Sequence, residues 1–134
     1  MDDKQDVTGV WYGRYQADQW DETNGFIAVL EEAGGVVDGV ITERDTEEQV
    51  DVRRALVRGH RDGAVVSFIK QYDGSGGHSH AIDYAGRIDA EGIEISGAWS
   101  RAWSSGRFVM EREKFDAAAM QADEEVELTE PVLR

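Results

Sequence analysis

The stretch Val7-Thr8-Gly9-Val10-Trp11-Tyr12-Gly13-Arg14-Tyr15 alternates between apolar and polar positions, and the chain repeats this rhythm seven more times. The last repeat is Arg107-Phe108-Val109-Met110-Glu111-Arg112-Glu113, and glycine-rich or acidic residues separate the runs. Because side chains on a strand alternate between faces, each run indicates a strand with one buried face. Eight such strands in one antiparallel meander close most economically into a barrel. We therefore expect an all-β protein with a single eight-stranded antiparallel β-barrel.

Turn signals place these strands along the chain. Gly34-Gly35 and Asp62-Gly63 predict tight hairpin turns, and Ser104-Ser105-Gly106 is expected to close the last hairpin. The fourth run also allows a helix over 53–58, but the turn signal at Asp62-Gly63 favours a strand. The expected strands are about 7–17, 25–30, 36–43, 50–58, 64–72, 78–89, 93–103 and 107–113.

The composition predicts one barrel domain over residues 1–114 and an acidic extension over 115–134. The extension carries six acids against one base, and its alanines favour a short helix or a mobile tail. The chain has no cysteine, which excludes thiol catalysis and disulfides.

The charge and the hydrophobic pattern exclude several classes of function. A net charge of −14 argues against nucleic acid as a partner, because nucleic-acid binding requires clustered Lys and Arg. No run of about 18 apolar residues exists, so we expect no transmembrane helix. Residues 1–6 lack the apolar stretch of a secretory signal, so we expect a cytoplasmic protein.

The segment Gly9-Val10-Trp11-Tyr12-Gly13 resembles the opening of lipocalins and of avidin-like barrels. The avidin resemblance extends over roughly residues 7–113 and rests on short motifs at 35–39, 68–72 and 84–87 and on Trp99. It implies an avidin-like or calycin-like, that is lipocalin-related, up-and-down barrel with a pocket for a small molecule.

The same resemblance argues against biotin as the ligand. Where the avidin family places the polar side chains that bind the ureido group, this chain has Gly13, Ala17, Ile41 and Arg112. At the positions where the avidin family places the tryptophans that line its pocket, this chain also has aromatic residues. These residues are Phe68, Tyr84 and Trp99.

Alternation along each strand predicts an inner face that is aromatic but also basic. A buried cation needs a carboxylate, water or an anionic ligand as a partner, and Glu43 shares the inward parity. Two readings therefore stay open: an internally paired barrel and an anion site. The expected inward residues are Trp11, Gly13, Tyr15, Val66, Phe68, Lys70, Tyr72, His80, Ile82, Tyr84, Gly86, Ile93, Ile95, Gly97, Trp99, Arg101, Phe108, Met110 and Arg112.

Our leading expectation is a barrel that binds an anionic small molecule with an aromatic or apolar part. Aromatic side chains would supply apolar contact, and the cations would supply charge-assisted hydrogen bonds. Arg112 is expected to lie over Trp11 and to plug one barrel end. The expected ligand-binding residues are Tyr15, Phe68, Lys70, Tyr72, His80, Tyr84, Trp99 and Arg101.

Two other functions stay open. One is an interaction module with a filled barrel, which would act through its outer surface or its acidic tail. The other is an isomerase or cyclase, suggested by fold analogy alone. No nucleophile with a base stands out, so we assign no catalytic residue and no cofactor. His78-Ser79-His80 lacks a third ligand, so we expect no metal. Association into homo-oligomers is left open.

Overall fold

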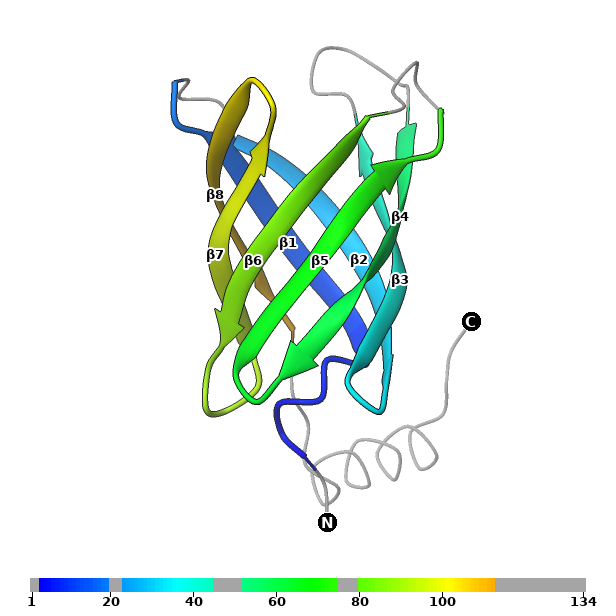
Figure 1. Ribbon diagram of the computed structural model, residues 1–134, viewed down its shortest axis with the longest axis vertical. Helices are drawn as coiled ribbons and strands as arrows, with labels where there is room; N and C mark the ends of the chain where they lie inside the picture. Colours follow the sequence, from blue (N-terminus) through cyan, green and yellow to red (C-terminus); the bar gives the residue numbers. More distant parts are fainter. Residues whose placement is uncertain (1–2, 20–22, 45–51, 75–79, 113–134) are drawn as a thin grey trace, which may run out of the picture.

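A computed structural model describes residues 3–19, 23–44, 52–74 and 80–112, and these residues form one closed barrel (Figure 1). Every strand pairs antiparallel with its neighbours in the chain, and the last strand pairs with the first. The expected all-β, eight-stranded meander barrel is confirmed. The strands are β1 (Gly9–Ala17), β2 (Thr23–Ala33), β3 (Val36–Arg44), β4 (Val52–Asp62), β5 (Val65–Tyr72), β6 (Ala81–Ile88), β7 (Glu94–Arg101) and β8 (Ser104–Glu111).

The β2–β3 and β4–β5 turns lie where glycine permits a left-handed backbone. Gly34 and Gly35 have φ values of 58° and 83°, and Gly63 has a φ of 61°. The fourth run is a strand throughout its described length. The last hairpin differs from the prediction, because Arg101 pairs with Ser104 and leaves residues 102–103 as the turn. Residues 104–106 therefore belong to β8, since their pairing with β7 outweighs their turn-like composition.

Side chains of alternate residues fill the interior. Trp11, Ile41 and Met110 are completely buried, as the alternation predicts. Ile93 is an exception, with 39% of its surface exposed. It lies before β7, in the turn after Gly92, where its N–H donates to the carboxylate of Asp89. The strand alternation therefore does not extend to it.

The core requires a glycine at one position of β1. A Cβ atom on Gly13 would overlap the ring of Phe26, its partner on β2. The missing side chain therefore leaves the space that this phenylalanine occupies inside the barrel.

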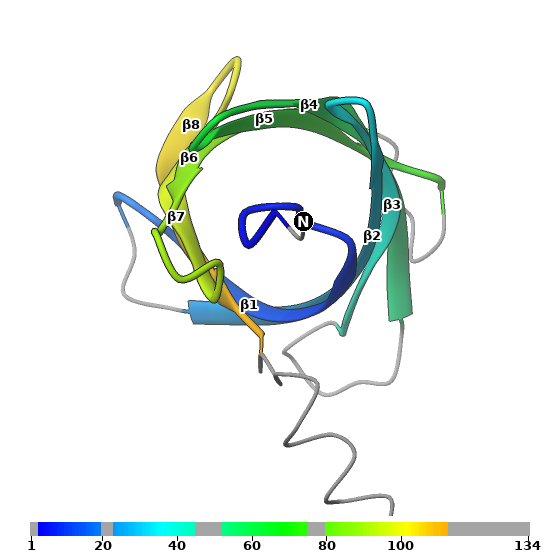
Figure 2. The ribbon, with the colours of Figure 1, turned by 90° about the horizontal axis from the view of Figure 1, so that it is seen from below.

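The lower end of the barrel, as drawn in Figure 1, is covered by the N-terminal segment. Seen from below, this segment lies across the ring of strands (Figure 2). Val7 is completely buried, and the guanidinium of Arg112 lies 4.4 Å from the ring centroid of Trp11. Arg112 donates to the carbonyls of Thr8, Asp6 and Lys4 and to that of Gly92. One basic side chain thus ties the segment to the barrel.

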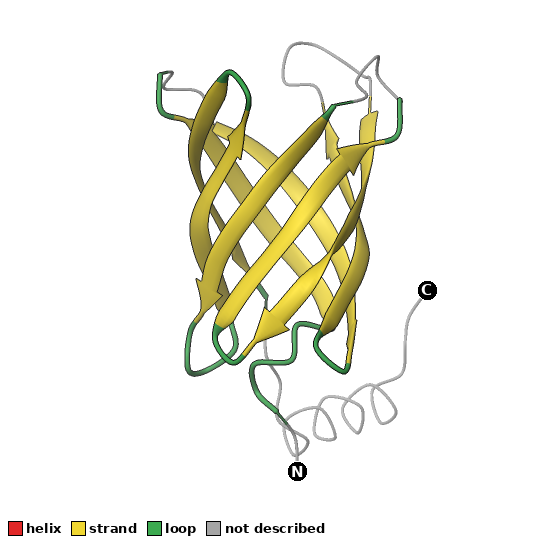
Figure 3. Ribbon diagram, in the orientation of Figure 1, coloured by secondary structure: helices red, strands yellow, loops and turns green. Residues whose placement is uncertain are grey.

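Every regular element among the described residues is a strand (Figure 3). No membrane-spanning helix is found in that part of the chain. The predicted acidic extension over 115–134 and His78 lie outside the described residues.

Candidate functional site

The polar residues of the interior gather at the upper end of the barrel, opposite the N-terminal segment. Strands β1, β3, β5 and β7 run toward this end, while β6 begins there (Figure 1). Of the predicted ligand-binding residues, His80 and Arg101 are half-buried at this end, and Tyr15 is partly buried below them. The others are buried inside: Phe68, Lys70, Tyr72, Tyr84 and Trp99.

A buried carboxylate organises the interior cluster. Oε1 of Glu43 accepts hydrogen bonds from the hydroxyls of Tyr15 (2.8 Å) and Tyr72 (2.7 Å). Its Oε2 accepts from Nζ of Lys70 at 3.0 Å, and Arg53 lies 3.1 Å from Oε1. Glu43 and Lys70 are 2% and 0% exposed, so the pair is shielded from water. The carboxylate that the sequence offered as a partner for an inward cation is paired with Lys70.

Aromatic rings surround the ammonium of Lys70. Its Nζ lies 4.6 Å from the ring centroid of Tyr15, 4.8 Å from that of Tyr72 and 5.2 Å from that of Tyr84. Cations are stabilised over aromatic faces, especially where water is excluded. The rings and the carboxylate together stabilise the buried charge of Lys70, which would be strongly unfavourable without them.

The surroundings shift the pKa values of this cluster. Burial alone would raise the pKa of Glu43, but the charge of Lys70 and hydrogen bonds from Tyr72, Lys70 and Tyr15 hold it below its ordinary value. Burial lowers the pKa of Lys70, and the attraction of Glu43 offsets only part of that effect. Burial also raises the pKa values of Tyr15 and Tyr72, with the charge of Glu43 acting in the same direction.

These contacts make Glu43 a poor general base. Both of its oxygens already accept hydrogen bonds from its own chain, and its lowered pKa means that the carboxylate has a reduced affinity for a proton. Lys70 has an equally fixed partner. The pair is therefore suited to a structural role in the barrel and to setting the local charge.

A second group of residues lies at the rim of the same end. Nη1 of Arg101 donates to Nε2 of His80 at 2.8 Å, which requires the imidazole nitrogen to be an acceptor. Nε of Arg101 donates to Ser104 at 2.8 Å, and its guanidinium lies over the ring of Trp103 at 4.9 Å. No carboxylate among the described residues forms an ion pair with Arg101. In this part of the chain, the guanidinium therefore contacts neutral groups: the imidazole of His80, the hydroxyl of Ser104 and the indole of Trp103.

Two buried donors lie beneath this rim. The hydroxyl of Tyr84 and Nε1 of Trp99 have no hydrogen-bond partner among the described residues. The two residues are directly paired across β6 and β7, and they are 1% and 4% exposed. Buried donors without acceptors are costly, so each one calls for an explanation.

The rings that carry these donors are fixed by packing. Tyr84 stacks on Phe68 with 4.9 Å between ring centroids, and Phe108 contacts its ring edge-on at the same distance. The indole of Trp99 lies against Gly106, where a Cβ atom would come within 2.7 Å of it. Apolar packing therefore holds the two donors in place, with no hydrogen-bond partner in the described part of the chain.

A hollow of about 420 Å³ opens beside the rim group. Arg101 and Trp103 line it from the β7–β8 hairpin, and Asp18 and Gln19 line it from the segment after β1. Asp18 accepts a hydrogen bond from Ser105. The volume is within the usual range for small-molecule sites.

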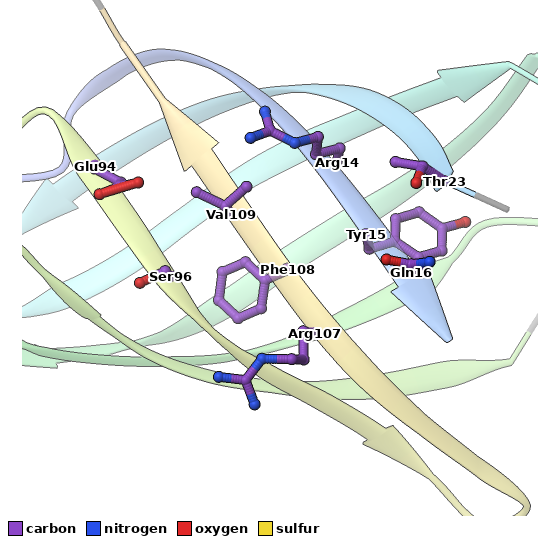
Figure 4. Close-up of a pocket in the computed structure, with 9 residues that line it drawn as sticks. All are labelled: Arg14, Tyr15, Gln16, Thr23, Glu94, Ser96, Arg107, Phe108 and Val109. Carbon is purple, nitrogen blue, oxygen red and sulfur yellow. The ribbon is translucent and has the colours of Figure 1, made fainter. Parts of the chain in front are cut away.

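Another hollow, of about 410 Å³, lies on the outer wall of β1, β7 and β8 (Figure 4). Its two arginines, Arg14 and Arg107, extend in different directions from separate strands (Figure 4). Arg14 is 3.7 Å from Glu111, and both side chains are more than half exposed. The polar groups of this hollow do not converge on one point.

Sequence reasoning missed two members of the site. Arg53 shares the inward parity of Ala55 and Val57, a signal that the ambiguity of the fourth run concealed. Trp103 was placed inside a strand, whereas it lies in the turn beside Arg101. In the described part of the chain, no three histidine, aspartate or glutamate side chains are grouped to hold a metal ion.

A scan against protein-family models finds no match, and neither a search of curated proteins nor a search of solved structures returns one. The residues of the site itself therefore carry the functional argument.

Proposed function

We propose that this barrel binds a small anionic molecule with a flat apolar part at its upper end. The pair of buried donors on Tyr84 and Trp99, unpartnered among the described residues beneath Arg101, carries this proposal. A ligand oxygen would supply the acceptor that these donors lack, and the guanidinium would supply the opposite charge.

The local charge supports an anion rather than a cation. Among the described residues, the three cations Lys70, Arg53 and Arg101 outnumber the two carboxylates, Glu43 in the interior cluster and Asp18 in the lining of the adjoining hollow. The whole chain, in contrast, has a net charge of −14. Positive charge gathered inside an acidic protein favours a negatively charged ligand there.

The aromatic side chains support a ligand with a flat apolar part. The Arg101 guanidinium lies 5.7 Å from the ring centroid of Trp99 and 4.9 Å from that of Trp103, and Trp103 is 65% exposed. In this proposal the exposed indole covers the apolar part of the ligand, while the anionic group faces Arg101 and His80. Tyr15, Tyr72 and Lys70 shape the floor through Glu43 rather than by direct contact.

The architecture also supports a distant relation to avidin-like or calycin barrels. The closed eight-stranded meander agrees with the short motifs that suggested this relation. A shared fold does not fix the ligand, so the resemblance supports a binding role only in general terms.

The test is a calorimetric titration with a panel of aromatic carboxylates, such as benzoate and 2-naphthoate, beside the matching uncharged amides. We expect a carboxylate of the panel to bind and its amide to bind at least about tenfold more weakly, because the amide cannot pair with the guanidinium. Arg101→Gln should weaken carboxylate binding by a similar factor. Arg107→Gln, on the outer wall, is the matched control and should leave it unchanged. Equal binding of acid and amide would contradict the proposal.

A further inference from the structure

An apolar stripe covers part of the outer wall of the barrel. Its members project outward, and each is between 39% and 60% exposed. Scattered apolar residues are normal on a protein surface, but contiguous patches mark interaction sites. The apolar stripe consists of Val10, Tyr12, Ile27, Val29, Val40, Leu56 and Ile69.

The strand register makes this stripe continuous. Val10 pairs with Val29, Val29 with Val40, and Val40 with Leu56, which gives one row across β1, β2, β3 and β4. Tyr12 and Ile27 form a second paired position directly beside this row. Neighbouring strands are about 4.8 Å apart, so these side chains contact one another along the row.

A hollow of about 620 Å³ adjoins one end of the stripe. Leu56 and Ile69 line it together with the polar side chains of Asp38, Arg58 and Gln71. The stripe therefore adjoins a depression in the outer wall, which a projecting side chain of a partner could enter.

The charges around the stripe are nearly balanced. The outward charged residues nearest to it on β1 to β4 are three basic and two acidic, in a chain of net charge −14. On the neighbouring strands, Glu111 and Asp83 add two acids where they pair with Tyr12 and Ile69 of the stripe. Asp38 and Arg58 pair at 3.2 Å. A second copy of this acidic chain could approach this face without strong repulsion, whereas an acidic partner would gain little there. The five charged residues on β1 to β4 are Arg14, Glu31, Asp38, Arg54 and Arg58.

We propose that the apolar stripe is the contact face of a homodimer. Seven side chains at these exposures present on the order of several hundred Å², and with their surroundings they approach the about 800 Å² per partner of a standard interface. A twofold axis through the stripe would bring the same apolar row of each copy together. The stripe lies on the outer wall, so the dimer is independent of the ligand proposed for the upper end.

Sedimentation velocity of the full chain, with and without a charge in the stripe, tests this proposal. The wild type is expected to sediment with twice the monomer mass. Leu56→Glu and Val29→Glu each place a carboxylate in the row and should raise the dimer dissociation constant by at least about tenfold. Both side chains project outward, so circular dichroism and the melting temperature should show an intact barrel.

Ile93→Glu is the matched control, because this exposed isoleucine lies in the β6–β7 turn, outside the strands β1 to β5 that carry the stripe. It should leave the dimer intact. A monomeric wild type, as expected if another part of the chain covers the stripe, would overturn the proposal. A dimer that survives both stripe variants, or one that Ile93→Glu disrupts equally, would also overturn it.

Discussion

At the scale of single residues, Glu43 and Lys70 depend on each other. Each is almost completely buried, and each is the closest opposite charge to the other, with 3.0 Å between Nζ and Oε2. Removing one member of a buried ion pair leaves the other charge without compensation, which costs far more than the pair itself contributes.

Lys70→Met should therefore destabilise the protein strongly. We expect the free energy of unfolding to fall by up to about 3–5 kcal/mol, because Glu43 would keep its buried charge and lose its nearest cation, with Arg53 at 3.1 Å left to compensate part of that charge. Urea unfolding followed by tryptophan fluorescence measures this loss.

The double variant Glu43→Gln/Lys70→Met is the control, since it removes both charges. It should recover part of the lost stability. A single variant as stable as the wild type would show that the pair has no structural role.

The inward positions of the site residues were predictable because strand alternation applies to every side chain in a paired strand. Tyr15, Lys70 and Trp99 all project inward as predicted. Which cation pairs with Glu43 was not predictable, because it depends on the stagger between strands β3, β4 and β5. The two donors that have no partner among the described residues could not be predicted either, since hydrogen-bond pairing depends on how the interior packs.

At the scale of the elements, the strands follow from their alternation, and the glycine turns follow from backbone geometry. Gly34 and Gly35 have positive φ values, as a two-residue hairpin requires. The last hairpin was misplaced because Ser104, Ser105 and Gly106 are common in turns but pair well as a strand here. The composition shows which residues favour turns, whereas the pairing register of the two strands decides which residues form the turn.

The N-terminal segment is the element that closes the lower end, and Arg112 holds it. Arg112→Lys keeps the charge but loses the planar guanidinium, whose N–H groups donate to the carbonyls of Thr8, Asp6 and Gly92. We expect a loss of about 1–3 kcal/mol in the free energy of unfolding. Hydrogen exchange at residues 3–8 should also become faster.

Arg107→Lys is the matched control for this prediction, because Arg107 lies on β8, which ends one residue before Arg112, and projects outward. It should change neither the stability nor the exchange rate. Unchanged exchange in Arg112→Lys would show that other contacts hold the segment.

At the scale of the whole molecule, the buried tyrosines predict a loss of stability in alkali. Burial raises the pKa values of Tyr15, Tyr72 and Tyr84, so these groups stay protonated in the folded barrel while the unfolded chain ionises near pH 10. Stability is therefore full below about pH 10 and falls as the pH rises further, by up to about 1.4 kcal/mol per pH unit for each tyrosine. The lowered pKa of Lys70 acts in the opposite direction, but it is one group against three.

Urea unfolding between pH 8 and about pH 11.5 measures this dependence. The rise in tyrosinate absorbance from the three buried residues should coincide with unfolding. Ionisation of these tyrosines in a barrel that stays folded would contradict the prediction.

The most direct test of the proposed ligand site compares Tyr84→Phe with Tyr72→Phe, two variants that each lose one buried hydroxyl. Tyr72→Phe removes a hydrogen bond to Glu43 and should cost about 1–3 kcal/mol of stability. Tyr84→Phe removes a donor without an acceptor among the described residues, so the ligand-free protein should be at least as stable as the wild type. Its affinity for the bound carboxylate should fall about tenfold. A Tyr84→Phe variant that loses stability but keeps full affinity would contradict the ligand site.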